Sequence, residues 1–120
     1  MKNEEKDLQP RTKLFARRII RLYVALPKTD TVAQVLGKQV LRSGTSVGAN
    51  YREANRARSK AEFIAKMGDC LKEADETLYW LELLLEEKVF STRRLEPLVK
   101  ESNELVAIFI TIVKRARGHV

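Results

Sequence analysis

The sequence has little of the material that catalytic and metal sites require. Among its 120 residues there are one cysteine and one histidine. Disulfide frameworks, four-ligand zinc sites, two-histidine metal centres and di-iron bundles with paired Glu-x-x-His motifs all need more. A Ser or Cys nucleophile with a histidine base is also left without plausible material, since the sequence has a single histidine, His119. We therefore expect no enzymatic activity, no metal and no cofactor.

Glycine, proline and long apolar runs are also scarce. Five glycines and three prolines are too few to supply the many turns of a protein made of sheets, so helices should dominate. The longest unbroken apolar run, Val106–Ile110, is far shorter than the roughly 20 residues that span a bilayer. The first thirteen residues contain no apolar core of a signal peptide. The expected location is the cytoplasm, with no membrane partner.

What the sequence does have is positive charge and a substantial apolar fraction. Lys and Arg number 23 against 16 for Asp and Glu, which gives a net charge of +7, and 44% of the residues are hydrophobic. This composition predicts one folded, basic domain rather than a disordered chain. Binding or assembly becomes the leading class of function, with nucleic acid as the most obvious partner.

Apolar residues recur at three- and four-residue spacing in four stretches, which predicts four amphipathic helices. We expect them over about 12–26, 31–57, 60–87 and 93–117, after flexible residues 1–11. Thr12, Asp30 and Ser59 are the expected N-caps, Glu62 gives Ser59 the spacing of a capping box, and Pro97 should lie near the first turn of the last helix. Residues 12–117 should therefore form a single all-α domain, an antiparallel up-down-up-down four-helix bundle.

The third and fourth helices are the most apolar. The third has a seam with alternating four- and three-residue steps, formed by Phe63, Met67, Cys70, Ala74, Thr77, Leu81 and Leu84. In the fourth, residues 106–113 are apolar almost all round, so part of this surface would face water in a monomer. This favours a homo-oligomer.

Charge is divided between two helices. Residues 31–60 hold six basic and one acidic residue, whereas residues 61–90 hold three basic and eight acidic ones. At about 100° per residue, five cations share the face of the second helix opposite its apolar residues. This basic stripe comprises Lys38, Arg42, Arg52, Arg56 and Lys60. The third helix has an acidic stripe of Asp69, Glu73, Glu76 and Glu87, with Trp80 among them.

The sequence leaves three interpretations of the basic stripe. It can contact the phosphates of RNA or another nucleic acid without reading sequence, assisted by Arg17, Arg18 and Arg21. It can instead meet the acidic stripe of a neighbouring subunit, with Trp80 as an interface anchor, in a scaffold that docks a protein partner. A simply solvated face is the third interpretation.

Small residues between Arg42 and Ala54 lower helix propensity and indicate close approach of another backbone, or a kink near Gly48. This segment, Arg-Ser-Gly-Thr-Ser-Val-Gly-Ala-Asn-Tyr-Arg-Glu-Ala, resembles a family of small four-helix bundle proteins first known from intervening sequences in bacterial 23S ribosomal RNA genes. The family pattern falls on Arg42, Ser46 with Val47, Asn50 and Glu53 with Ala54, and continues at Phe63 and Ile64. The resemblance extends over roughly residues 12–116. Gly48 stands where many relatives have proline, and Pro97 is a second departure.

The resemblance implies an antiparallel four-helix bundle that assembles as a ring-like homopentamer, with no established enzymatic activity. It also implies an association with nucleic acid, through the ribosomal RNA genes and through related basic bundles that assist reverse transcriptases in diversity-generating retroelements. The subunit count rests on this resemblance alone.

Overall fold

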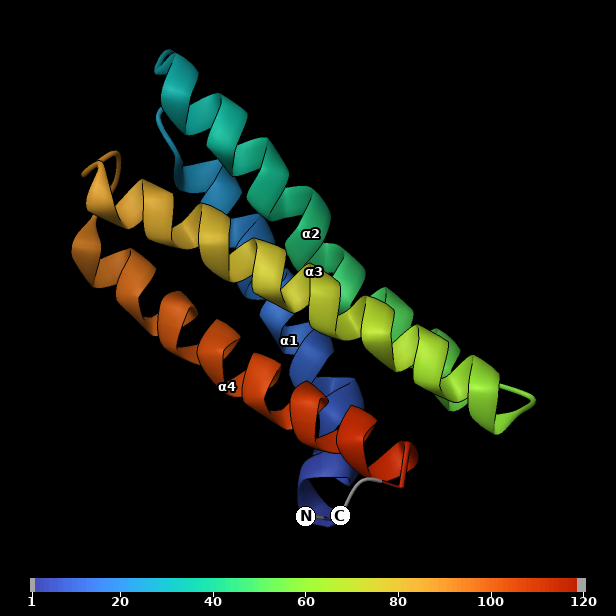
Figure 1. The fold of residues 1–120 in the computed structure, drawn as a ribbon. Coiled ribbons are helices and arrows are strands. Elements are labelled where there is room, and N and C mark those ends of the chain that lie inside the picture. Colours follow the sequence, from blue (N-terminus) through green and yellow to red (C-terminus); the bar gives the residue numbers. More distant parts are fainter. Residues whose placement is uncertain (1, 119–120) are drawn as a thin grey trace.

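The chain folds into four long helices joined by short turns (Figure 1). The computed structural model describes residues 2–118, with side chains from residue 8 onward. The helices are α1 (Lys2–Ala25), α2 (Thr31–Asn55), α3 (Lys60–Glu86) and α4 (Thr92–Ala116), and no strand occurs among the described residues. The molecule is elongated, with principal extents of 47 × 23 × 19 Å. The all-α four-helix fold predicted from the sequence is confirmed.

Consecutive helices run antiparallel. Gly37 of α2 lies against Leu26 just past the end of α1, and Gly44, further along α2, lies against Ile19, earlier in α1. The pairs Ser43–Thr77 and Glu53–Lys66 show the same opposite direction for α2 and α3. Helix α2 packs against α1 and α3, and α3 packs against α4, whereas α1 and α4 approach each other at fewer positions. The boundary between α1 and α4 is therefore the most open one.

Side-chain caps fix the starts of three helices. The carboxylate of Asp30 accepts a hydrogen bond from the backbone N–H of Ala33 at 3.0 Å, and the hydroxyl of Ser59 accepts one from Glu62 at 3.0 Å. Both caps were predicted. Ser91 caps α4 by accepting from the N–H of Arg94 at 3.2 Å. Pro97 is the sixth residue of α4, slightly beyond the first turn where it was expected.

The expected start of the first helix at Thr12 is wrong. Helix α1 begins at Lys2, and Thr12 lies inside it with its buried hydroxyl donating to the carbonyl of Leu8 at 2.7 Å. Leu8 and Thr12 extend the buried stripe of Phe15 toward the N-terminus, and this burial stabilises the additional turns. Of the segment 1–11 expected to be flexible, Met1 lies outside the described residues and residues 2–11 are helical.

The core lies along the common axis of the helices. Phe15 and Phe109 are its largest fully buried side chains, and the ring of Tyr51 lies 6.4 Å from that of Phe109. The predicted seam of α3 is buried from Met67 to Leu84, and Phe63 at its beginning is half-buried. Burial raises the pKa of the Cys70 thiol to about 12, so this cysteine is a neutral core residue at neutral pH.

Glycines bring α1 and α2 close together. A Cβ atom on Gly44 would lie 2.8 Å from Cγ1 of Ile19, and one on Gly48 would lie 3.2 Å from Oγ1 of Thr12. A larger residue at Gly44 would force Ile19 to move, and one at Gly48 would be in tight contact with Thr12. The close approach predicted from the small residues of this segment is confirmed, with α1 as the neighbouring helix.

Candidate nucleic-acid interface

The basic stripe lies on the exposed side of the bundle, opposite the core. Lys38, Arg42 and Arg52 are exposed on α2, Arg56 is exposed as its C-cap, and Lys60 is exposed as the first residue of α3. Val40, Val47 and Tyr51, on the opposite side of α2, are buried. The helical projection therefore placed these cations on the correct face.

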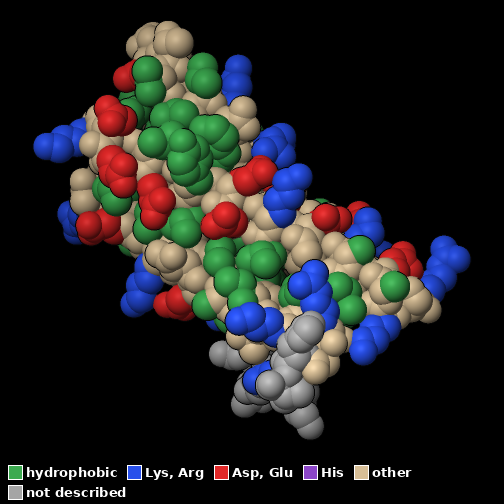
Figure 2. Space-filling view, viewed as in Figure 1, with side chains coloured by type: hydrophobic (Ala, Val, Ile, Leu, Met, Phe, Trp, Pro, Cys, Tyr) green, Lys and Arg blue, Asp and Glu red, His purple; other side chains and the backbone are tan. Residues whose placement is uncertain are grey.

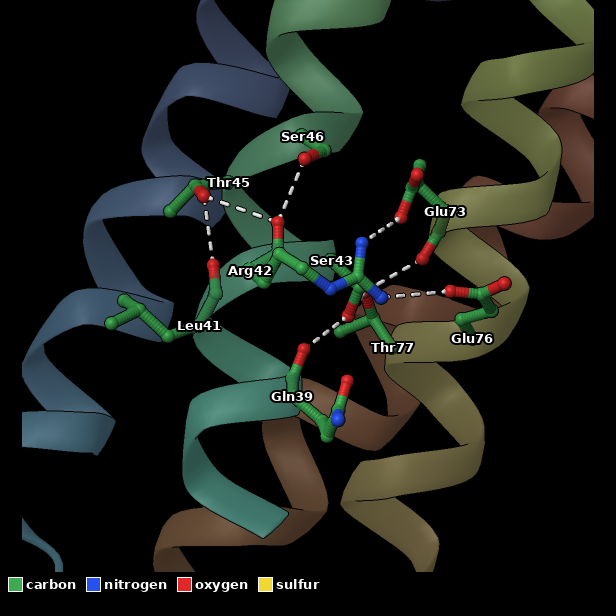
Figure 3. Close-up of polar contacts among 9 residues, drawn as sticks. All are labelled: Gln39, Leu41, Arg42, Ser43, Thr45, Ser46, Glu73, Glu76 and Thr77. Carbon is green, nitrogen blue, oxygen red and sulfur yellow. Dashed lines mark hydrogen bonds and ion pairs between the residues drawn. The ribbon is translucent and has the colours of Figure 1, made fainter. Parts of the chain in front are cut away.

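Arg42 differs from the other members of the stripe because it is paired within the chain. Its guanidinium lies 3.1 Å from a carboxylate oxygen of Glu76 and 3.5 Å from one of Glu73, both on α3 (Figure 3). The basic and acidic stripes thus meet at the boundary between α2 and α3. A helical projection treats each helix separately and could not show this contact. Arg42 is the least available cation of the stripe for an external anion.

The family-motif residues hold the second helix in place. The hydroxyl of Ser46 donates to the carbonyl of Arg42 at 2.8 Å, within the same helix. Glu53 pairs with Lys66 of α3 at 2.7 Å, and this hydrogen bond raises the pKa of Lys66. Asn50 is half-buried. Arg42, Ser46 and Glu53 thus make contacts within α2 and to α3.

Arg52 and Arg56 line a groove between α1 and α2. The groove has a volume of about 470 Å³, and Lys13 of α1 adds a third cation to it. Glu53 also lines it, but its carboxylate is engaged by Lys66. None of the three cations has an ion pair within the described part of the chain.

Sequence reasoning missed Lys13, although a signal was present. Residues 8–28 contain six basic residues and no acidic one, which makes this segment strongly one-sided in charge. Only Arg11 among these cations is paired in the described structure, with Glu101 at 2.7 Å and Glu104 at 2.8 Å on α4. The hydrogen bond with Glu101 raises the pKa of Arg11 further above its ordinary value. Arg17 and Arg21 are exposed and Arg18 is half-buried.

The acidic stripe borders an exposed apolar surface, which we call the α2–α3 patch and define by Val32, Val35, Tyr79 and Trp80. Val32, Val35 and Tyr79 are 51%, 55% and 55% exposed. The Trp80 ring lies 5.1 Å from that of Tyr79, and its buried Nε1 has no hydrogen-bond acceptor among the described residues. Figure 2 shows hydrophobic side chains gathered over this end of α2 and α3, with acidic side chains beside them.

The remaining acidic-stripe residues fall into two groups. Glu73 and Glu76 are half-buried beside Arg42, whereas Asp69 and Glu87 are exposed. Among the described residues, no three His, Cys, Asp or Glu side chains are grouped so as to hold a metal ion. Within the same residues, no helix combines the length and apolar character needed to cross a membrane.

Comparisons with known proteins agree on one family. The family described as 23S rRNA-intervening sequence protein matches residues 4–111. A crystal structure from Bacteroides thetaiotaomicron, described as a protein of unknown function from the S23 ribosomal protein family, is 42% identical with a TM-score of 0.81. The similarity covers 88% of this chain and 97% of that one. No curated protein matches the chain significantly.

Proposed function

Because the chain belongs to the 23S rRNA-intervening sequence protein family, we propose that it is a non-enzymatic bundle that binds RNA through the cations of α1 and α2. The proposed RNA contacts are the cations of the basic stripe that have no ion pair within the chain, together with cations of α1. Lys13, Arg52 and Arg56 are the central contacts, because they line one groove. Lys38 and Lys60 extend the surface along α2 and to the start of α3.

The observation that supports this function is the absence of carboxylate partners for these cations in the described structure, although the chain contains 16 acidic residues. Arg11, Arg42 and Lys66 show that side-chain pairing across helix boundaries is available in this fold. Unpaired Lys and Arg along a groove suit a phosphate backbone, since each phosphate contact releases condensed counterions. Such contacts position a nucleic acid without reading its sequence.

Reversing two of these charges tests the assignment. We expect Arg52→Glu with Arg56→Glu to weaken binding of a fluorescein-labelled single-stranded RNA about tenfold or more, because two attractions become repulsions. The slope of log affinity against log salt should fall by about 1.4, or roughly 0.7 for each lost phosphate contact. Fluorescence anisotropy across a salt series measures both quantities.

Lys72→Glu with Lys100→Glu is the matched control, because both lysines are exposed on α3 and α4 and the net charge changes equally. It should bind RNA nearly as the unaltered protein does. Equal losses in both double variants would show that only net charge matters and would refute this surface. An oligomer that dissociates when Arg52 and Arg56 are reversed would instead support the stripe as a subunit contact.

A second part of the proposal is that the chain is a homo-oligomer, for which the α2–α3 patch gives the specific observation. Three large apolar side chains more than half exposed, one of them in ring contact with Trp80, are typical of a protein interface. A second copy fits the patch, because Ile20 and Val24 are 45% and 62% exposed on the basic helix α1. Such a contact joins different surfaces of two copies, and its repetition closes into a ring when the rotation allows.

The double substitution Val35→Arg with Tyr79→Arg tests the assembly. Both side chains would carry charge into a desolvated contact, so the oligomer should dissociate to the mass of a single chain. Size-exclusion chromatography with light scattering measures the mass. Asn103→Arg, at an exposed polar position of α4, is the control and should leave the mass unchanged. A single-chain mass for the unaltered protein would refute the assembly.

A further inference from the structure

A groove between α1 and α4 is surrounded by four arginines. Arg18 and Arg21 come from α1, Arg93 and Arg94 come from the start of α4, and the groove has a volume of about 250 Å³. No Asp or Glu appears among its described lining residues. None of the four guanidinium groups has an ion pair in residues 8–118. The groove is therefore a concentrated and unneutralised positive site.

Elsewhere along the boundary between α1 and α4, an arginine is neutralised by glutamate side chains. About two turns away, Arg11 of α1 reaches Glu101 and Glu104 of α4 at 2.7 and 2.8 Å. Helices α1 and α4 can thus place arginine and glutamate opposite each other. At the groove they place arginines opposite arginines, which repel one another unless an anion lies between them.

The start of α4 gives a second and independent indication. Arg93 and Arg94 occupy its first turn, which contains no acidic residue, and the positive end of the helix dipole disfavours cations there. Helix α3 has the favourable arrangement, in which Ser59 is followed three residues later by Glu62. Helix α4 has Arg94 at the corresponding position after Ser91. Helix α4 therefore has no capping box in its first turn, which faces the groove.

The floor of the groove is apolar. Leu22 of α1 and Leu98 of α4 lie at its base and are 2% and 4% exposed, and Pro97 lines it beside them. Arg94 lies 5.7 Å above the ring centroid of Phe90. Arginines around an apolar floor match a nucleotide, whose phosphate needs forked donors and whose base needs an apolar or planar contact. The bases of a duplex are already stacked and paired and would not reach the floor.

We propose that this α1–α4 arginine groove binds phosphates of single-stranded RNA, with an unpaired base against the exposed ring of Pro97. The inference rests on the proposed RNA-binding function and specifies the strandedness of the ligand. The groove lies on the opposite side of α1 from the groove of Lys13, Arg52 and Arg56. The two grooves are therefore separate sites on the two sides of α1.

The test uses Arg93→Glu with Arg94→Glu and a fluorescein-labelled 12-nucleotide oligouridylate. We expect affinity for this probe to fall about tenfold and the salt slope to fall by about 1.4, because two phosphate contacts are lost. The melting temperature should not fall, since glutamates suit the first turn of α4 and Arg94→Glu completes a capping box with Ser91. Loss of binding in an equally stable protein would support the groove. Lys72→Glu with Lys100→Glu again controls for net charge.

The outcomes separate this inference from the proposed function. If Arg52→Glu with Arg56→Glu weakens binding while Arg93→Glu with Arg94→Glu does not, the groove is refuted and the proposed function stands. If the unaltered protein does not bind the oligouridylate or a duplex RNA, both fail. A duplex bound as tightly, with the same loss on reversal, refutes the single-strand assignment. A reduced oligomer mass with unchanged RNA affinity shows that the groove holds acidic residues of a second copy and refutes the inference.

Discussion

Replacing Phe109 with alanine is expected to lower the free energy of unfolding by about 3–5 kcal/mol, the usual cost of removing a buried phenylalanine. The side chain is 0% exposed and lies on α4 facing the centre of the bundle, beside the Tyr51 ring of α2. Its removal takes away both the transfer free energy of the ring and the contacts that line the resulting cavity. Urea unfolding followed by circular dichroism measures the loss.

The next residue along the chain provides a control. Ile110 is 38% exposed, so Ile110→Ala should cost about 1 kcal/mol or less. Both proteins must be compared at one chain concentration, because assembly would contribute to apparent stability. Similar losses for the two substitutions would contradict the placement of Phe109 in the core.

The same chemical change at two glycines is expected to have opposite effects. Gly44→Ala puts a Cβ 2.8 Å from Cγ1 of Ile19, and the stiff branched side chain of Ile19 also has Cγ2 at 3.0 Å from that point. Such overpacking costs about 1–3 kcal/mol. Gly68→Ala on α3 meets nothing within 4 Å, so the better helix propensity of alanine should stabilise the protein by up to about 1 kcal/mol.

Thermal unfolding of the two variants under identical conditions measures this contrast. A lower melting temperature for Gly44→Ala together with a higher one for Gly68→Ala is the expected pattern. Stabilisation by both substitutions would mean that α1 can move away from α2 at little cost. In that case the glycines of α2 would not be needed for close packing.

Local sequence patterns predicted most of the fold because helix signals are themselves local. Asp30 and Ser59 bond to backbone groups three residues away, so their capping role is visible in a short window of sequence. The seam of α3 repeats every three or four residues for the same reason. The start of α1 was missed because Leu8 is one apolar residue in a polar stretch, and its burial depends on helices distant in sequence.

The candidate site was predictable only in part. A projection of α2 identified which cations face away from the core, but it could not show that Glu73 and Glu76 come close to Arg42. Lys13 joins Arg52 and Arg56 only because α1 packs antiparallel to α2. Arg18 and Arg93 lie 75 positions apart in the sequence, and only the packed bundle places them beside one groove.

The separation of positive charge on α1 from negative charge on α3 gives the molecule an electric dipole moment. In Figure 1 the acidic helix α3 lies in front and the basic helix α1 lies behind it. Such a chain is an electric dipole as well as a cation of +7, so the field of a polyanion turns it while the two are still apart. With a polyanionic partner, rotation toward the α1 side would precede contact, and a larger share of encounters would be productive. Raising the ionic strength would shorten the range of this alignment.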